Sequence, residues 1–120
     1  MMTNIVYIAL GSALGGVCRY LVSLALNSQG GFPWGTLCVN VVGSLAIGAL
    51  SGWIAHCSGN AAAMRAFAVV GFCGGFTTFS TFSSELFAML ESARIGMACA
   101  YFLASVSAGL AGVWLGSSFR

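Results

Sequence analysis

Four long apolar stretches limit what this chain can fold into. They cover residues 5–26, 34–55, 65–90 and 95–115. Each is close to the roughly 20 residues that a helix needs to cross a bilayer core about 30 Å thick. Only 5% of the 120 residues are charged, far fewer than the roughly 25% of an ordinary soluble domain. The sequence therefore predicts one all-α transmembrane domain over residues 1–120, with four membrane-spanning helices joined by short polar links.

The charged side chains are too few and too scattered for a soluble protein or for nucleic-acid binding. The formal net charge is +2, and four separated arginines do not form the basic patch that nucleic-acid binding requires. No stretch remains for a soluble domain, so any chemistry must happen inside the membrane. We expect neither a nucleic-acid partner nor an enzyme, but a lipid-embedded protein.

The arginines also bear on orientation, because an excess of Lys and Arg marks the cytoplasmic side. If Arg19 is grouped with the first link, one side carries Arg19 and Arg94, and the other carries Arg65 and Arg120. This balance favours neither orientation. It predicts insertion both ways up, with pairing as a dual-topology antiparallel homodimer.

Small residues recur at helical spacing in three of the four stretches, where they permit close approach of helices. Part of this surface serves packing within the subunit, but we expect much of it to face a second subunit. The positions are Gly11, Gly15, Ser44, Gly48, Gly52, Gly96, Ala100, Ala104, Ser105, Ala108, Gly109, Gly112 and Gly116.

The middle of the third stretch is unsuited to a lipid-facing helix. Gly74 and Gly75 are followed closely by Thr77 and Thr78, and we expect the helix to break at the glycine pair. Non-helical backbone at membrane depth is tolerated where protein buries it or where it lines a wet cavity, and its freed groups bind ions. The alternative is a kinked helix whose hydroxyls bond to the preceding turn.

Aromatic, hydroxyl and amide side chains surround this expected break. Phe79 and Phe82 are three residues apart and share a helical face, with Ser80 and Thr81 between them. Asn40 is an amide inside the second apolar stretch. Phenylalanine ring edges are electropositive, and hydroxyl and amide donors replace the hydration of a small anion. These residues suggest an anion pathway, although core packing and interhelical hydrogen bonding explain them equally well.

Three motifs resemble the Fluc (CrcB) family of fluoride channels. They are Gly15 to Tyr20, Gly35 to Gly43 and, above all, Gly74 to Glu85, whose G-G-F-T-T-F-S-T-F-S run is long and specific. The resemblance covers nearly the whole chain. It implies an antiparallel homodimer with two fluoride pathways, each built from both subunits.

The resemblance also implies roles for single residues. The phenylalanines and the amide would contact fluoride, Arg19 would stand at the vestibule unless it only reaches toward the membrane interface, and Tyr101 would be a pore tyrosine. The backbone carbonyls of Gly74 and Thr77 would bind a structural sodium ion at the dimer centre. The implied fluoride pathway consists of Arg19, Asn40, Phe79, Ser80, Thr81, Phe82 and Tyr101.

From these observations we expect passive efflux of fluoride across the inner membrane. The alternative is a small proton-coupled exporter, which needs a carboxylate deep in the membrane. Glu85 is its only candidate in the sequence and lies toward the end of its stretch. A non-transporting assembly subunit would explain the small-residue stripes but would leave the polar run from Thr77 to Ser84 without a role.

The balanced arginines give a first prediction. Reporter fusions at the C-terminus should signal from both sides of the membrane, because no charge excess selects one orientation. Activity of a periplasmic and a cytoplasmic reporter, each fused to the same residue, measures this. A C-terminus found on one side only would contradict the antiparallel dimer.

Overall fold

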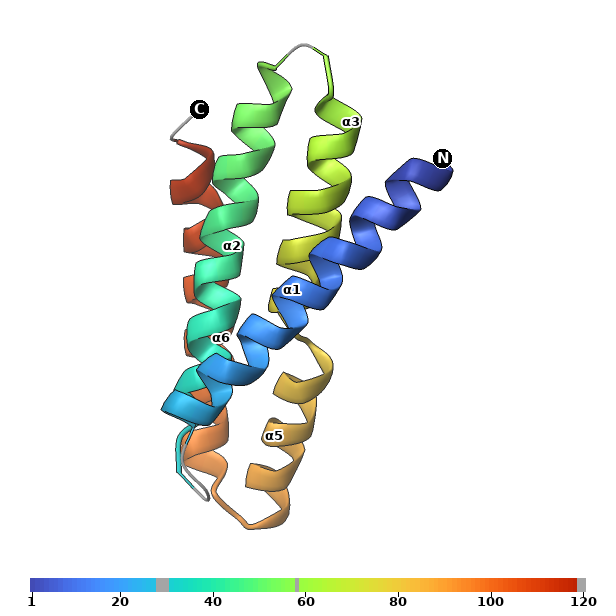
Figure 1. The fold of residues 1–120 in the computed structure, drawn as a ribbon. Coiled ribbons are helices and arrows are strands. Elements are labelled where there is room, and N and C mark those ends of the chain that lie inside the picture. The colour runs from blue at the N-terminus through green and yellow to red at the C-terminus, as the bar shows by residue number, and fades with distance from the viewer. Residues whose placement is uncertain (28–30, 58, 119–120) are drawn as a thin grey trace.

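Four membrane-length helical stretches make up the computed structural model, which describes residues 1–27, 31–57 and 59–118 (Figure 1). Three are continuous: α1 (Met2–Leu26), α2 (Trp34–Ala55) and α6 (Ile95–Ser117). The other is divided into α3 (Ala61–Met64), η1 (Arg65–Cys73), α4 (Gly74–Phe76) and α5 (Ser80–Glu91). The prediction of an all-helical protein with four candidate membrane spans is confirmed for the described residues.

The helices extend slightly beyond the predicted bounds. The first begins at Met2 rather than at residue 5, the third stretch covers 61–91 rather than 65–90, and the fourth ends at Ser117 rather than at residue 115. Helical hydrogen bonding continues beyond the apolar residues at these ends, where hydropathy no longer marks the helix. Residues 28–30 and 58 of the predicted links, and Arg120 of the charge tally, lie outside the described residues.

The expected break in the third stretch is present, but the prediction that it lies at the glycine pair is wrong. Gly74 has helical torsions (φ −62°, ψ −38°), whereas Thr77 is extended (φ −88°, ψ 159°) and separates α4 from α5. Gly75 packs tightly against Ser12 of α1, in the helical part of the stretch. The interruption therefore comes at Thr77 to Phe79, and a merely kinked helix does not describe this stretch.

The segment before the break is a π-helix. In η1 the helix is wound more widely than an α-helix, and the Gly74 N–H donates to the carbonyl of Val69, five residues earlier. Such turns are rare and occur often near functional sites. Nothing in the hydrophobic pattern had predicted it.

Helix α1 crosses η1 and α4 at an angle, with backbone lying against backbone (Figure 1). Gly11 of α1 lies against Gly71, and Gly15 lies against the backbone of Phe72 and Phe76. A Cβ added at Gly71 would lie 2.9 Å from the Ile8 carbonyl oxygen, and one at Gly75 would lie 2.6 Å from that of Ser12. Only glycine allows this approach, so the four glycines fix α1 beside the break.

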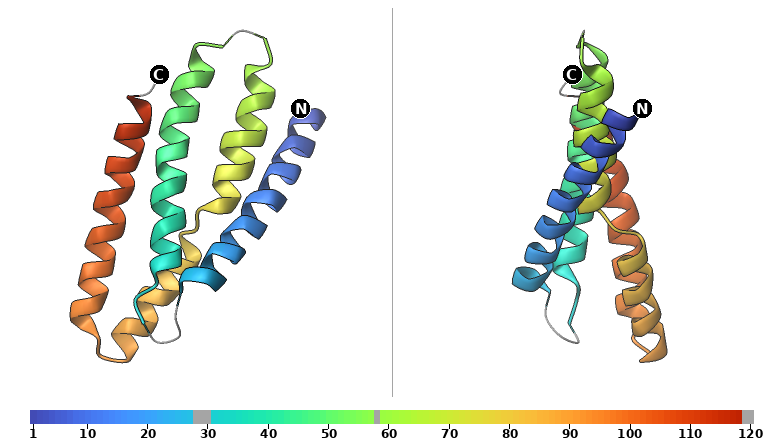
Figure 2. Two further views of the ribbon diagram at one scale, coloured as in Figure 1. Left: turned by 60° about the vertical axis from the view of Figure 1, so that its left-hand side comes forward. Right: turned by 45° about the vertical axis from the view of Figure 1, so that its right-hand side comes forward.

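Helix α2 packs along α6, and the two lie side by side in Figure 2. A Cβ added at Gly48 would meet the Val113 carbonyl, and one at Gly116 would meet that of Leu45. Gly112 is buried against Val41 of α2. The expectation that much of the small-residue surface faces a second subunit is therefore wrong for the glycines of α1 and for most of those in α2 and α6. Of the α6 stripe, Gly96 and Ala100 remain exposed.

Two neighbouring glycines of α1 offer a matched test of this packing. Gly15→Ala should lower the free energy of unfolding by about 1–3 kcal/mol, because the added methyl group meets the Phe72 carbonyl and forces the helices apart. Gly16→Ala has nothing within 4 Å and should leave stability unchanged or raise it slightly. Denaturant unfolding in detergent measures both variants. Equal effects would contradict the helix crossing.

Candidate functional site

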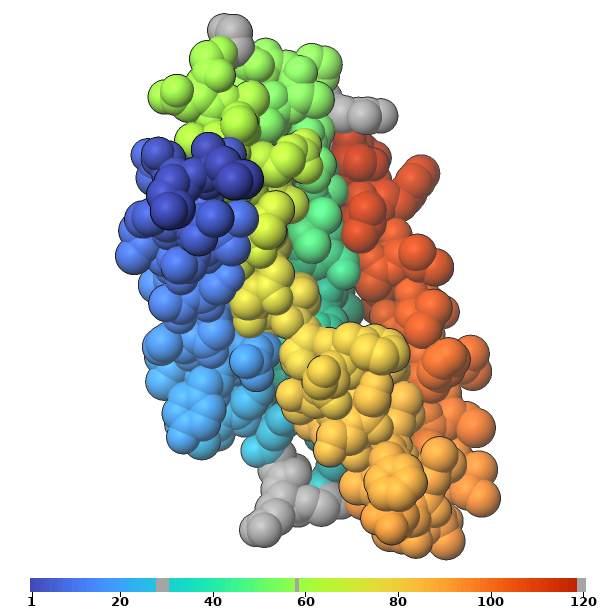
Figure 3. Space-filling model, turned by 90° about the vertical axis from the view of Figure 1, so that its right-hand side faces the viewer, coloured from blue at the N-terminus to red at the C-terminus, as the bar shows by residue number. Residues whose placement is uncertain are grey.

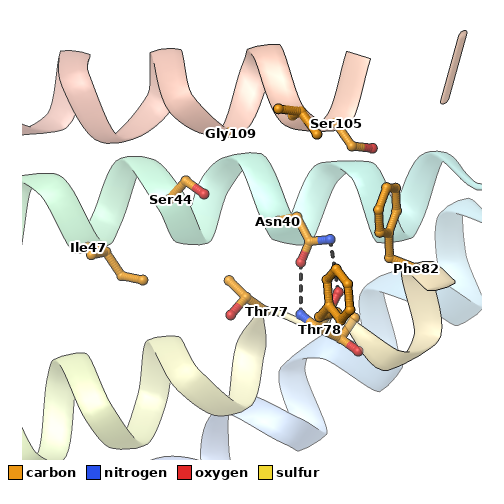
Figure 4. A pocket seen from close by; sticks show the side chains of 10 residues that line it. Asn40, Ser44, Ile47, Thr77, Thr78, Phe82, Ser105 and Gly109 are labelled. Atoms are coloured by element: carbon orange, nitrogen blue, oxygen red, sulfur yellow. Dashed lines mark hydrogen bonds between the residues drawn. The ribbon is translucent and has the colours of Figure 1, made fainter. Parts of the chain in front are cut away.

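An open groove of about 290 Å³ lies where α2, the break and α6 meet (Figure 4). It joins residues that are far apart in the sequence. Its lining residues are Asn40, Ser44, Ile47, Thr77, Thr78, Phe79, Phe82, Ser105, Val106 and Gly109. None of these side chains is charged, and five carry a hydroxyl or an amide. The groove therefore offers hydrogen-bond donors and ring edges without a fixed charge.

Asn40 pairs with the backbone of the break. The Thr78 N–H donates to Asn40 Oδ1 at 2.8 Å, and Asn40 Nδ2 donates to the Thr78 carbonyl at 3.1 Å (Figure 4). Both backbone groups of Thr78 are thus satisfied by one side chain, which explains an amide within an apolar span. The pairing uses one of the two Nδ2 hydrogens, so the amide has a further donor.

The two predicted phenylalanines line the same groove but differ in burial. Phe79 precedes α5 and is 78% exposed, whereas Phe82 lies within α5 and is 7% exposed. Their ring centroids are 6.2 Å apart. The Phe82 ring packs edge-to-face against Tyr101 at 4.9 Å, which fixes its orientation.

The hydroxyls of the site are distributed differently from the prediction. Ser80 is exposed and Thr81 is half-buried, and neither lines the groove of this subunit. Ser105 does line it, from α6. Among the described residues its Oγ is buried without a hydrogen-bond partner, which costs free energy unless a ligand or water bonds to it. Sequence analysis had counted Ser105 only among the small packing residues.

Arg19 turns toward the break. Its Nε donates to the Gly75 carbonyl at 3.1 Å, close to the carboxyl end of α4. A cation there is favoured by the negative end of the helix dipole. The side chain therefore bonds to protein at the break, rather than only reaching toward the membrane interface.

Tyr101 lies outside the groove, in a polar network around Glu85. It is fully buried, and its hydroxyl donates to Glu85 Oε1 at 2.8 Å. Thr36, also fully buried, donates to Glu85 Oε2 at 3.0 Å and accepts a hydrogen bond from Asn27 Nδ2 at 3.3 Å. Both oxygens of Glu85 are therefore engaged as hydrogen-bond acceptors within the subunit. Sequence analysis missed Thr36 and Asn27, for which the pattern held no signal beyond their places at helix ends.

The two carbonyls predicted to bind sodium lie on either side of the end of α4. In a continuous helix the Thr78 N–H would donate to the Gly74 carbonyl, but here it donates to Asn40. Gly74 is exposed on the surface of the subunit, and the extended Thr77 takes its own carbonyl out of the helix. The break thus frees backbone oxygens of the kind that bind a hard cation.

Comparison with known proteins shows one matching family and several similar proteins. The family model described as CrcB-like protein, Camphor Resistance (CrcB), matches residues 6–117. A protein of Methylobacterium nodulans named fluoride-specific ion channel FluC is 48% identical over 113 residues, which cover 93% of this chain and 91% of that protein. A protein of the same name from Novosphingobium aromaticivorans is 42% identical over 121 residues, with coverage of 98% and 95%. Another, from Rhizobium meliloti, is 44% identical over 117 residues, with coverage of 96% and 94%.

Proposed function

The chain belongs to the CrcB family, and on this basis we propose that it is a fluoride-specific ion channel that lets fluoride leave the cell passively through the inner membrane. It is a transport protein and not an enzyme, since the relatives that cover nearly all of it are named as channels. The observation in the molecule that carries the proposal is the uncharged groove between α2, the break and α6, lined by donors and aromatic rings.

The chemistry of this groove suits a small, strongly hydrated anion. Fluoride gives up its water only where other donors replace it, and the second N–H of Asn40 and the unpaired hydroxyl of Ser105 are such donors. The positive edges of Phe79 and Phe82 add a weak attraction. Because none of the described residues that line the groove is a cation, the ion is attracted without being trapped.

The other residues predicted for the pathway lie outside the groove, and we assign them supporting roles. Arg19 supplies positive potential near the break, which draws anions toward the pathway. Ser80 and Thr81 supply hydroxyls at the start of α5. Tyr101 contributes by packing against the ring of Phe82.

We propose that the working unit is an antiparallel homodimer. The groove is open on one side, and Phe79, Gly74 and Ser80 are exposed at the middle of a membrane stretch. Figure 3 shows the junction between α4 and α5 at the surface of the subunit, beside α1. Irregular backbone at this depth is not tolerated against lipid. A second copy that covers the junction would satisfy this requirement and complete the groove.

We also propose that the carbonyls of Gly74 and Thr77 bind a structural sodium ion. One subunit offers these two oxygens, too few to surround a cation, and an antiparallel partner would offer the same two from the other side. The support within the subunit is the loss of the helical donor to the Gly74 carbonyl.

The proton-coupled exporter is not favoured. It requires Glu85 to exchange protons with substrate, but both oxygens of that carboxylate are engaged within the subunit, by the hydroxyls of Thr36 and Tyr101. The relatives of this chain are named as ion channels.

Fluoride efflux from liposomes tests the pathway. Phe82→Ile keeps an apolar side chain but removes the ring edge, and should lower efflux by roughly threefold to tenfold. Asn40→Asp should lower it by roughly 100-fold or more, because a negative charge of similar shape repels the anion at low dielectric. A fluoride electrode records the rate, with chloride efflux as the control for selectivity.

Glu85→Gln separates the channel from the exporter. The channel predicts a smaller loss for Glu85→Gln than for Asn40→Asp, whereas an exporter predicts that Glu85→Gln abolishes transport. The dimer content of each preparation must be equal for the rates to be compared. Near-normal efflux in both Phe82→Ile and Asn40→Asp would refute the pathway.

Replacing sodium by a large organic cation tests the metal site. Dimer stability and fluoride efflux should both fall, and Gly74→Ala should alter the sodium dependence more than Thr77→Val does. Within the subunit a methyl group at Gly74 meets only the Val69 carbonyl oxygen, at 3.9 Å, so any effect must arise beyond the subunit. Thermal unfolding and efflux, each measured with and without sodium, give the result. Identical values in both buffers would exclude the sodium ion.

A further inference from the structure

Thr78 is the central residue of the break and makes three hydrogen bonds that join two other parts of the chain. Its N–H and its carbonyl both pair with Asn40 of α2, at 2.8 and 3.1 Å. Its side-chain Oγ1 accepts the N–H of Thr81, in the first turn of α5, at 3.1 Å. Neither the sequence motif nor its proximity to the phenylalanines had distinguished Thr78 from the hydroxyl residues around it.

The bond to Thr81 caps the start of α5. The first N–H groups of a helix have no carbonyl of their own turn to bond, and a threonine oxygen just before the helix satisfies one of them. Phe79, which stands at the cap position, makes no side-chain bond of this kind. The neighbouring Thr77 faces the other way, since its hydroxyl donates to the Cys73 carbonyl in η1. The hydroxyl of Thr77 therefore bonds to the helical part before the break, and that of Thr78 bonds to the helix after it.

These bonds determine where the aromatic rings lie. Phe79 follows Thr78 directly, and Phe82 follows the capped Thr81. Without the cap and the Asn40 pairing, the torsions of the break would be free to change the direction of α5. The rings, whose centroids are 6.2 Å apart, would then move with it.

We propose that Thr78 is a positioning residue for conduction, which acts by holding Phe79 and Phe82 in place through its capping oxygen and its clamped backbone. The proposal rests on the fluoride channel function proposed above. It also gives Asn40 a second role, because the amide acts on the rings through Thr78. The competing explanation is that the Thr78 hydroxyl, which lines the groove, donates to the ion directly.

The experiment compares Thr78→Val, which keeps the shape but removes the capping oxygen, with Thr78→Ser, which keeps the oxygen. Ser12→Ala is the control, because Ser12 also donates an intramembrane hydroxyl to the third stretch, at the Gly71 carbonyl, but lies outside the break. Fluoride efflux per dimer is one measurement. The other is the ¹⁹F resonance of 4-fluorophenylalanine in place of Phe79, recorded in fluoride-free buffer so that no ion contributes.

Thr78→Val should shift this resonance and lower efflux by roughly fivefold to thirtyfold, the range that corresponds to losing one helix cap. Thr78→Ser should restore both values, and Ser12→Ala should change neither. An unshifted resonance together with reduced efflux would mean that the hydroxyl binds the ion, and would overturn the positioning role. Unchanged efflux in Thr78→Val would overturn it as well.

Thr78→Ala also removes the capping oxygen but puts no methyl group in its place. It serves as a second test variant if the valine variant misfolds. If both variants fail to assemble while Thr78→Ser assembles, the residue serves stability alone and the proposal is wrong. A wild-type protein that conducts no fluoride would instead contradict the proposed function, whereas failure of this inference leaves wild-type efflux intact.

Discussion

An unpaired backbone N–H or carbonyl inside a bilayer costs several kcal/mol, because no water is present to replace the missing bond. Where α4 ends, backbone groups of the third stretch lose their helical partners, and side chains from neighbouring helices replace them. Asn40 pairs with both groups of Thr78, and Arg19 donates to the Gly75 carbonyl. These partners come from α2 and α1, so both helices must pass close to the break. The glycines at which α1 crosses the third stretch make that approach possible.

The coarse fold could be predicted because membrane insertion imposes a simple rule on composition. The bounds of the predicted spans agree with those of the helices to within a few residues, because apolar length alone defines a span. The position of the break could not be found in this way. Gly75 stays helical beside Ser12 while Thr78 turns to Asn40, a residue 38 positions away, and no local pattern contains either contact. For the same reason, the sequence pattern did not predict the π-helix or show which helix each glycine stripe contacts.

The candidate site was predicted in its chemistry more than in its geometry. Asn40, Phe79 and Phe82 come together in one groove, as amide and aromatic residues within apolar spans had suggested. Ser80 and Tyr101 do not line it, because the rotation of α5 and α6 about their axes decides which side chains face inward. That rotation depends on the break and on the packing of α6 against α2, which are tertiary features. The network of Thr36, Glu85 and Tyr101 was hidden for the same reason.

Asn40 recognises the backbone of Thr78 and not its side chain, and this gives the two positions unequal tolerance to mutation. Every residue except proline supplies an N–H and a carbonyl, so substitutions at 78 keep the pairing, and serine also provides an uncharged oxygen for the cap. No other common side chain offers the donor and acceptor of asparagine at the same length. The backbone pairing at the break therefore constrains α2, in a part of the gene distant from the codons of the break itself, whereas position 78 is constrained by its capping oxygen.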